Sequence, residues 1–386
     1  MESCHKTYLG CFFMETYLFA DIIYNILYYL NKNDSFNFIN MCKTAMKHKH
    51  YLYKKYVFNE NAITATNEFM HYIERIKISN IIDFNDFKFD NLTTIKFRLH
   101  YIYITKNMDL YLNIVLDNLP ETLLTLTMHY GTFNSSINKL PINLKNLSLQ
   151  CYHFNQSIDN LPLFLETLSI DCYMFNKSLP TLPKTLKKLK ISSNNFNQTL
   201  NNLPITINSL HIDSYNYDKE INLKYLTNLI SLKILNRDDV INFLPVNLIN
   251  LQICNYATLY KCINHLPINL KTLKITVHYL SGGLLDNLPQ TLESLILHIS
   301  HFNESLNNLP STLKHLSINS LCFNEPLSNL PKNLETLYIL SDTYNHSICN
   351  LPYNLQKLTL YCKNLTQSLD NLPISLKITK INNTLY

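Results

Sequence analysis

Residues 186–204, LKKLKISSNNFNQTLNNLP, decide the fold of this chain. Leu189 and Ile191 alternate with Lys190 and Ser192, and this period of two indicates a short strand with one buried face. Written as LxxLxIxxNxFxxxLxxLP, the stretch has the spacing of a leucine-rich repeat. A self-similar unit of 20 to 50 residues is typical of a solenoid, in which each coil packs only on its neighbours.

The same unit recurs along most of the chain. Twelve of the chain's Leu-Pro pairs recur at nearly regular spacing. Eight of their eleven intervals are 21 residues long, and two are 22. The prolines are Pro120, Pro141, Pro162, Pro183, Pro204, Pro245, Pro267, Pro289, Pro310, Pro331, Pro352 and Pro373. The 41-residue gap before Pro245 holds one degenerate copy, from Leu226 to Ile234. The sequence therefore predicts a parallel sheet along one wall, and 21 residues leave no room for a long helix on the other.

The second wall carries an aromatic residue followed by Asn, eight residues before seven of these prolines. The aromatic residues are Phe133, Phe154, Phe175, Phe196, Phe302, Phe323 and Tyr344. We expect these rings to stack from coil to coil. The Asn is expected to bond backbone groups that a tight, buried turn would leave unpaired.

These repeats resemble the FNIP family, a variety of leucine-rich repeat known from social amoebae and giant amoeba-infecting viruses. The resemblance covers residues 110–381 and rests on the spacing F-N-x-[ST]-[IL]-x-x-L-P-x-x-L-x-x-L-x-[IL]. Two earlier segments, around Ile76 and Ile95, fit the strand pattern without Leu-Pro, and we interpret them as atypical capping coils.

Apolar residues of the N-terminal segment follow helical spacing instead. Asp34 is a suitable N-cap for a second helix, and a third is predicted from His50 to Phe58. The string from Leu18 to Asp34, followed by Cys42-Lys43, resembles an F-box, although Phe19 stands where that family has Pro. The resemblance implies docking on the adaptor of a cullin-type (SCF) ubiquitin ligase through Leu18, Phe19, Ile22, Ile26, Leu27 and Leu30. The alternative is a plain helical cap that buries these residues against Ile76 and Ile95.

The predicted fold class is therefore α+β, a small helical F-box-like module followed by a leucine-rich-repeat-type parallel β-solenoid or horseshoe. The predicted divisions are a flexible N-terminus (1–14), the F-box-like module (15–60), capping repeats (61–109), the solenoid (110–381) and a tail (382–386).

Composition argues against several classes of function. The net charge is only +5 over 386 residues, whereas nucleic-acid binders carry a concentrated basic stripe. Ten cysteines show no C-x-x-C pair or zinc-finger spacing, which favours free thiols in a reducing compartment. No stretch approaches the length of a membrane span. Phosphate-loop, nucleophile-elbow and H-E-x-x-H motifs are missing. We therefore expect a non-enzymatic protein without metal, cofactor, nucleic-acid or membrane partner, located in the cytoplasm (the host's if the protein is viral).

The outward strand positions are the natural binding surface. The residues predicted to contact a target protein on this concave face are Asp171, Lys190, His211, Asp213, Lys233, Lys274, Tyr338 and Tyr361. The first hypothesis is a substrate receptor that links this target to adaptor and cullin. The second is an interaction scaffold or decoy without any ligase.

Overall fold

The computed structural model describes residues 58–59, 75–78, 92–98, 112, 115–219, 221–235, 244–254, 258–259, 266–280, 283–368, 372–382 and 384–385. The chain divides into two compact units, Met1–Leu165 and Glu166–Tyr386. We describe each unit by itself. The predicted helical module lies outside the described residues, apart from Phe58 and Asn59.

The first unit is a parallel ladder of short strands. They are β1 (Phe58–Asn59), β2 (Arg75–Ile78), β3 (Thr94–Arg98), β4 (Thr125–His129) and β5 (Asn146–Gln150). Ile76 pairs with Ile95, and Ile95 pairs with Leu126, so the two segments predicted as capping coils continue the ladder in register. Phe58 belongs to a strand that pairs with Ile76, so the predicted third helix is wrong at that residue.

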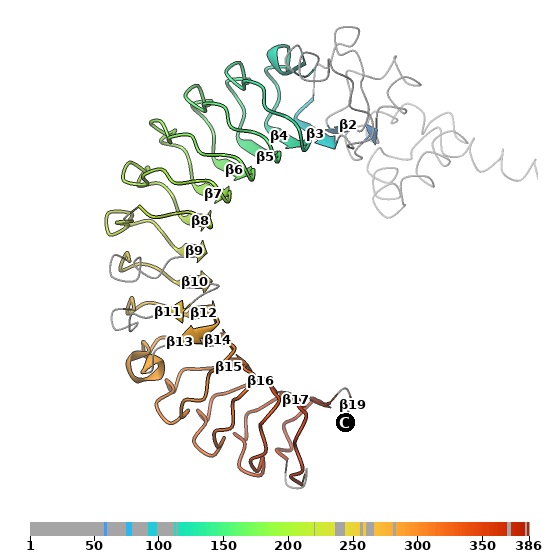
Figure 1. Ribbon diagram of the computed structural model, residues 1–386, viewed down its shortest axis with the longest axis vertical. Coiled ribbons are helices and arrows are strands. Elements are labelled where there is room, and N and C mark those ends of the chain that lie inside the picture. Colours follow the sequence, from blue (N-terminus) through green and yellow to red (C-terminus); the bar gives the residue numbers. More distant parts are fainter. Residues whose placement is uncertain are drawn as a thin grey trace, which may run out of the picture. The chain divides into compact units, whose positions relative to one another are not determined.

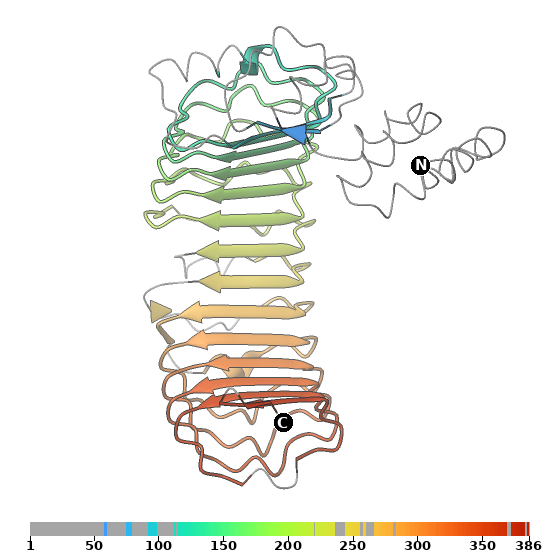
Figure 2. The same cartoon turned by 90° about the vertical axis from the view of Figure 1, so that its right-hand side faces the viewer.

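The second unit repeats the same coil many times. Its parallel strands are β6 (Thr167–Asp171), β7 (Lys188–Ser192), β8 (Ser209–Asp213), β9 (Ser231–Leu235), β10 (Asn250–Cys254), β12 (Thr272–Val277), β14 (Ser294–Ile299), β15 (His315–Asn319), β16 (Thr336–Ser341), β17 (Lys357–Cys362) and β18 (Ile378–Ile381). They lie side by side and point the same way (Figure 2). Loops form the opposite wall of the unit (Figure 1). That wall adds a two-strand pair, β11 (Thr258–Leu259) with β13 (Tyr279–Leu280), and the short 3₁₀ helix η5 (Leu284–Asn287).

The strand alternation has the predicted effect on burial. In β7, Leu189 and Ile191 are buried, whereas Lys190 and Ser192 remain partly exposed. Every strand from β4 to β10 buries its second and fourth residues in the same way. Leucine pairs with leucine and isoleucine with isoleucine between adjacent strands β7 and β8. Within each unit the buried row therefore forms an apolar core between the sheet and the loops.

Each Leu-Pro pair sets a tight turn just before a strand. The carbonyl of every one of the twelve prolines accepts a hydrogen bond from the N–H group three residues later, as Pro204 does from Ile207 (3.1 Å). The prolyl nitrogen has no hydrogen to donate, and none is required at this position. In the degenerate copy Leu226 takes the proline's place and accepts from Leu229 at 2.9 Å. The turn therefore survives the loss of proline, and β9 keeps its register.

The aromatic residues stack as expected. Ring centroids lie 5.8 Å apart for Phe133 and Phe154 in the first unit, and the planes are nearly parallel. In the second unit the separations are 6.0 Å for Phe175 with Phe196, 5.9 Å for Phe302 with Phe323 and 6.0 Å for Phe323 with Tyr344. We call this column the aromatic stack; its rings are essentially inaccessible to solvent.

The Asn residues that follow the rings form a second column, but the expectation of a buried turn is wrong. Asn176 and Asn324 are exposed. Each accepts, through its Oδ1, a hydrogen bond from the backbone N–H one coil later: Asn176 from Asn197 (2.9 Å) and Asn324 from Asn345 (3.0 Å). The side chain thus links neighbouring coils at the surface, where a one-residue insertion would break the bond.

Buried serines recur in the second unit, three residues before Phe196, Tyr217, Phe323 and Tyr344; we call them the buried serine column. Ser320 donates to the carbonyl of Phe302 at 2.9 Å, and Ser341 donates to that of Phe323 at 2.8 Å. These hydroxyls are at most 1% exposed, so they satisfy carbonyls that water cannot reach. Cys362 occupies the position of Ser341 in the next coil.

In the described run Phe302, Phe323 and Tyr344 of the aromatic stack, only Tyr344 carries a hydroxyl group. Its Oη is buried and has no hydrogen-bond partner. Burial raises the pKa of this phenol far above its usual value. Removing the unpaired group with Tyr344→Phe is expected to stabilise the second unit by about 1 kcal/mol. Chemical denaturation followed by circular dichroism measures the change; a loss of stability would mean that the hydroxyl has a partner in solution.

The C-terminal residues were predicted to be a tail, but they fold back. Strand β19 (Thr384–Leu385) pairs antiparallel with β18, joining Ile381 to Thr384. Asn382 turns the chain with a positive φ of 44°, and its side chain bonds both the N–H (2.8 Å) and the carbonyl (2.9 Å) of Cys362. Asparagine tolerates this left-handed conformation better than most residues. The hairpin covers the free edge of β18, which would otherwise be open to pairing with another strand.

Candidate interaction surface

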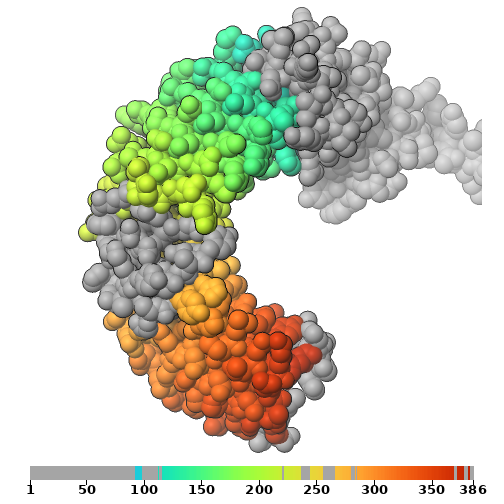
Figure 3. Space-filling view, in the orientation of Figure 1, coloured from blue at the N-terminus to red at the C-terminus, as the bar shows by residue number. Residues whose placement is uncertain are grey.

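We define the sheet face as the side of the second unit's sheet that is turned away from the loops. It consists of the first, third and fifth residues of strands β6 to β17, because alternate residues point away from the core. Figure 2 looks onto the strands that carry it. In the space-filling view the coils of residues 283–368 pack into one continuous body (Figure 3).

Strands β6 to β9 carry charged residues on this face. The Lys190 ammonium lies 2.6 Å from the carboxylate of Asp171 on the neighbouring strand. Ser192 Oγ lies 3.4 Å from Asp213 Oδ2, and His211 stands between Lys190 and Lys233 in the ladder. The structure thus brings five of the predicted target-binding residues together on adjacent strands. All five are partly exposed.

Burial and the two lysines act together on His211. Burial, then the charges of Lys233 and Lys190, lower the pKa of His211 from 6.5 to about 4. Its Nε2 is buried without a hydrogen-bond partner. Burial also raises the pKa of Asp213, against the opposing effect of Lys233. The imidazole is therefore neutral near pH 7, and the charge of this region comes from its lysines and aspartates.

A pH dependence of stability follows. Between about pH 6.5 and about pH 4 the unfolded chain protonates His211 and the folded chain does not, so stability decreases as the pH falls through this window. The raised pKa of Asp213 has the opposite effect on stability, in the pH range above the usual Asp pKa of 3.8. His211→Gln is expected to reduce the loss of stability between about pH 7.5 and about pH 5, measured by denaturation at both values. An identical loss in the variant would show that His211 is protonated when folded.

Strands β14 to β17 form a shallow groove of about 510 Å³ on the same face. Its lining consists of Ser294, Ile296, His315, Leu316, Ser317, Thr336, Leu337, Tyr338, Lys357, Thr359 and Tyr361. The rings of Tyr338 and Tyr361, both predicted target-binding residues, lie 5.9 Å apart and tilted by 57°. Two groove residues, His315 and Lys357, were not predicted from the sequence; they are the first residues of β15 and β17. The same alternation, extended one step towards the N-terminus of each strand, could have found them.

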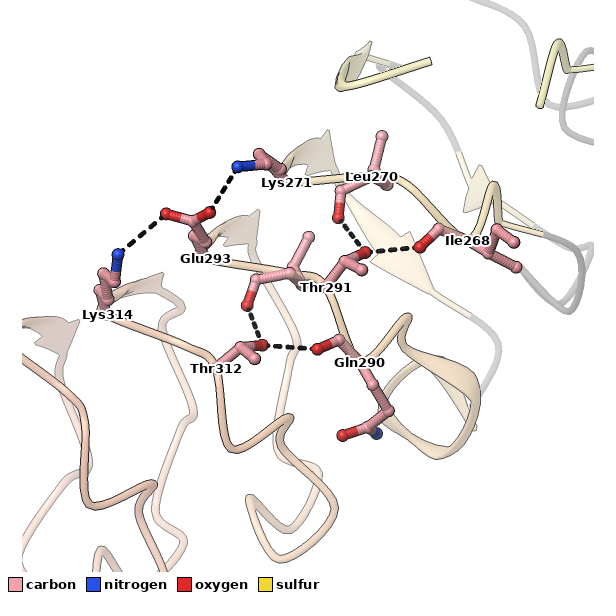
Figure 4. A network of polar contacts seen from close by, with 9 residues as sticks. Ile268, Leu270, Lys271, Gln290, Thr291, Glu293, Thr312 and Lys314 are labelled. Carbon is pink, nitrogen blue, oxygen red and sulfur yellow. Dashed lines mark hydrogen bonds and ion pairs between the residues drawn. The ribbon is translucent and has the colours of Figure 1, made fainter. Parts of the chain in front are cut away.

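Lysine and glutamate alternate at the positions just before β12, β14, β15 and β16, which are Lys271, Glu293, Lys314 and Glu335, and this row borders the groove. Glu293 accepts from Lys271 (2.9 Å) on one neighbouring coil and from Lys314 (3.1 Å) on the other (Figure 4). Beneath it, Thr291 donates to Leu270 at 2.9 Å, and Thr312 donates to Leu292 at 2.7 Å. These exposed ion pairs contribute little to stability singly. The charged residues of these pairs determine the charge at this edge of the sheet face, where one carboxylate, Glu293, is shared by two lysines.

The remaining predictions concern what the chain lacks. Among the described residues there is no cluster of three or more His, Cys, Asp or Glu residues that could hold a metal ion. The cysteines that the structure describes, Cys151, Cys172, Cys254, Cys322, Cys349 and Cys362, are free thiols. No helix in the described part of the chain is both long and apolar enough to cross a membrane.

The predicted binding residues fall into three groups. Asp171, Lys190, His211, Asp213 and Lys233 cluster on β6 to β9, Lys274 lies on β12, and Tyr338 and Tyr361 lie in the groove. The adaptor-binding set, Leu18, Phe19, Ile22, Ile26, Leu27 and Leu30, lies outside the described residues.

Comparison with known proteins supports the fold. No protein-family profile matches the sequence, and neither does any curated protein. Among solved structures, CroV588 from the giant virus CroV, described as a novel circular leucine-rich-repeat protein, is similar with a TM-score of 0.57 and 24% identity. The match covers 80% of this chain and 50% of that one, so this chain spans about half the length of CroV588. YopM from Yersinia enterocolitica aligns with a TM-score of 0.41 and 18% identity over 80% of this chain and 72% of its own. The fold is thus a parallel β-solenoid of the leucine-rich-repeat type.

Proposed function

We propose that this protein is a non-catalytic interaction scaffold that holds a partner protein on its sheet face. The observation that carries the proposal is the groove over β14 to β17, whose lining combines two tyrosines with Ile296, Leu316 and Leu337 among hydroxyl-bearing side chains. Tyrosines held on a fixed support contribute contact area at low entropic cost, and they are enriched where proteins bind one another.

The chemistry of the described surface favours binding over catalysis. The groove lining offers hydroxyl groups, one imidazole and one ammonium, but no carboxylate or thiol that could serve as a base or nucleophile beside them. The charged cluster on β6 to β9 contains His211 with two aspartates, yet the low pKa of this imidazole makes it a weak base.

Two sets of variants test the scaffold. Ser169→Arg with Ser317→Arg places bulk and charge on the sheet face, whereas Ser311→Arg with Tyr353→Arg does so on the exposed Leu-Pro turns. Partners retained by the wild-type chain and identified by mass spectrometry are expected to be lost from the first variant and kept by the second. Retention by both, or loss from the turn variant alone, contradicts binding on the sheet face.

The finer proposal is that the scaffold is a substrate receptor of a cullin-type ubiquitin ligase, in the cytoplasm. It is supported by the resemblance of Leu18, Ile22, Ile26, Leu27 and Leu30 to an F-box, placed before repeats that resemble the FNIP family. In this arrangement the N-terminal residues bind the adaptor, and the sheet face presents the target.

Leu27→Asp with Leu30→Asp tests the ligase link separately. The full-length wild type is expected to retain adaptor and cullin from amoebal lysate, and the double variant to lose them while its circular dichroism and sheet-face partners remain unchanged. If the wild type retains neither subunit, the N-terminal segment is a cap, and the protein is a scaffold or decoy without a ligase.

A further inference from the structure

The sheet face changes character along the second unit. Asp171 and Asp213 supply carboxylates on β6 and β8. From β9 to β17, in contrast, none of the outward positions is Asp or Glu, while Lys233, Lys274 and Lys357 are among them. We call this part of the sheet face, from β9 to β17, the cationic half-face.

Two of these lysines, Lys274 and Lys357, have unshared charge, whereas the charge of Lys233 acts on Asp213 of the neighbouring strand, where it opposes the rise that burial causes in the pKa of that carboxyl. Lys190, on the other half, is held by Asp171 at 2.6 Å, but Lys233, Lys274 and Lys357 form no ion pair with any described residue. The nearest carboxylate row offers little compensation, because Glu293 is already shared between Lys271 and Lys314. The outward positions of the half-face therefore carry a net positive charge, and the lowered pKa of His298, caused by burial and by Lys274, agrees with this sign.

The groove lies at the C-terminal end of the cationic half-face. Lys357 and His315, both exposed, stand at its margin, and Leu316 and Leu337 form part of its floor. Strands β15 and β16 are paired on both sides, so their backbone groups are already bonded within the sheet. A ligand on the face cannot add a strand and must be recognised by side chains: an apolar group against Tyr338 and Tyr361, and anionic groups near the lysines.

The dimensions favour an extended segment. The groove spans four adjacent strands, β14 to β17, or roughly 14 Å at about 4.8 Å per strand. An extended chain of about four or five residues covers that distance. Lys274 lies on β12, next to β14, so a few further residues of the same segment would reach it.

We propose that the cationic half-face binds a short, extended, acidic segment of a partner protein, with an aromatic or aliphatic residue in the Tyr338–Tyr361 groove and carboxylates near Lys274 and Lys357. This assignment rests on the proposed scaffold function and names the chemistry of its partner. It follows from charge complementarity, since a surface with unpaired lysines and no carboxylate discriminates against basic segments.

A nucleic acid is the competing occupant, and the arrangement of charge argues against it. A duplex carries one negative charge per about 1.7 Å, and its binders neutralise many phosphates at once. The cationic half-face has three lysines over seven strands, and Glu293 and Glu335 border it. A short peptide segment with a few carboxylates therefore matches these three lysines better than a polyanion does.

Fluorescence anisotropy with the full chain tests the assignment. The probes are three labelled peptide pools of about six residues, each with Phe, Tyr or Leu at the centre and with flanks of Asp/Glu, Lys/Arg or Ser/Gly. The acidic pool is expected to bind at least about tenfold more tightly than the other two. Tyr338→Ala with Tyr361→Ala is expected to remove that binding, and Lys274→Glu with Lys357→Glu to shift the preference to the basic pool.

Matched controls lie on the outer turns. Tyr353→Ala and Lys332→Glu make the same substitutions at exposed residues outside the groove and are expected to change nothing. Equal binding of the three pools, no binding of any pool, or tighter binding of a single-stranded oligonucleotide would overturn the assignment. If the Arg variants of the sheet face still lose partner proteins while the pools show no acidic preference, the scaffold function stands and this inference alone fails.

Discussion

Phe323→Ala is expected to lower the free energy of unfolding of the second unit by about 3–5 kcal/mol, the usual cost of removing a fully buried phenylalanine. Phe323 is 0% exposed and stacks between Phe302 at 5.9 Å and Tyr344 at 6.0 Å. Its loss opens a cavity that two neighbouring coils cannot close, because their rings are fixed by the same stack.

Chemical denaturation followed by circular dichroism measures this effect, since the chain has no tryptophan. Tyr353→Ala is the matched control: this ring is 68% exposed, and its removal is expected to cost about 0.5 kcal/mol or less. A cost below about 1 kcal/mol for Phe323→Ala would show that the aromatic stack is not part of the core.

Ser341→Ala is expected to cost about 1–3 kcal/mol, a large effect for the loss of one oxygen. The Ser341 hydroxyl is 0% exposed, donates to the carbonyl of Phe323 at 2.8 Å and accepts from the N–H of Thr343 at 3.3 Å. Both backbone groups lose a partner in the variant, and the Phe323 carbonyl lies where water does not reach it.

Ser341→Cys provides the conservative comparison, because Cys362 already occupies the equivalent position one coil later. Its cost is expected to be smaller than that of Ser341→Ala. Ser311→Ala, at an exposed turn, should leave the denaturation midpoint unchanged. If the alanine variants at positions 341 and 311 behave alike, the buried serine column does not join the coils.

The repeat made most of the fold predictable. Alternation in LKKLKIS predicts which residues of β7 are buried, and the constant spacing of the Leu-Pro pairs predicts the register of its neighbours, because equal coils can stack in only one way. The aromatic stack follows from the same spacing.

Features that depend on where a coil meets its neighbour were harder to predict. Asn176 accepts a hydrogen bond from the N–H of the next coil at the surface. The partner of this bond depends on the offset between neighbouring coils, and the sequence pattern within one coil does not specify that offset. The hairpin at Asn382 replaces a predicted tail, because a free strand edge gains bonds by pairing. The groove residues His315 and Lys357 were missed because they occupy the first positions of β15 and β17, whereas the prediction considered only the third and fifth positions.

The most direct test of the account is the affinity of the wild type and of Tyr338→Ala with Tyr361→Ala for a partner retained by the full chain. Surface plasmon resonance is expected to show a dissociation constant at least about tenfold higher for the groove variant and no change for Tyr353→Ala. The opposite pattern, an intact groove variant and a weakened Tyr353→Ala, would place the partner on the outer turns and contradict binding on the sheet face.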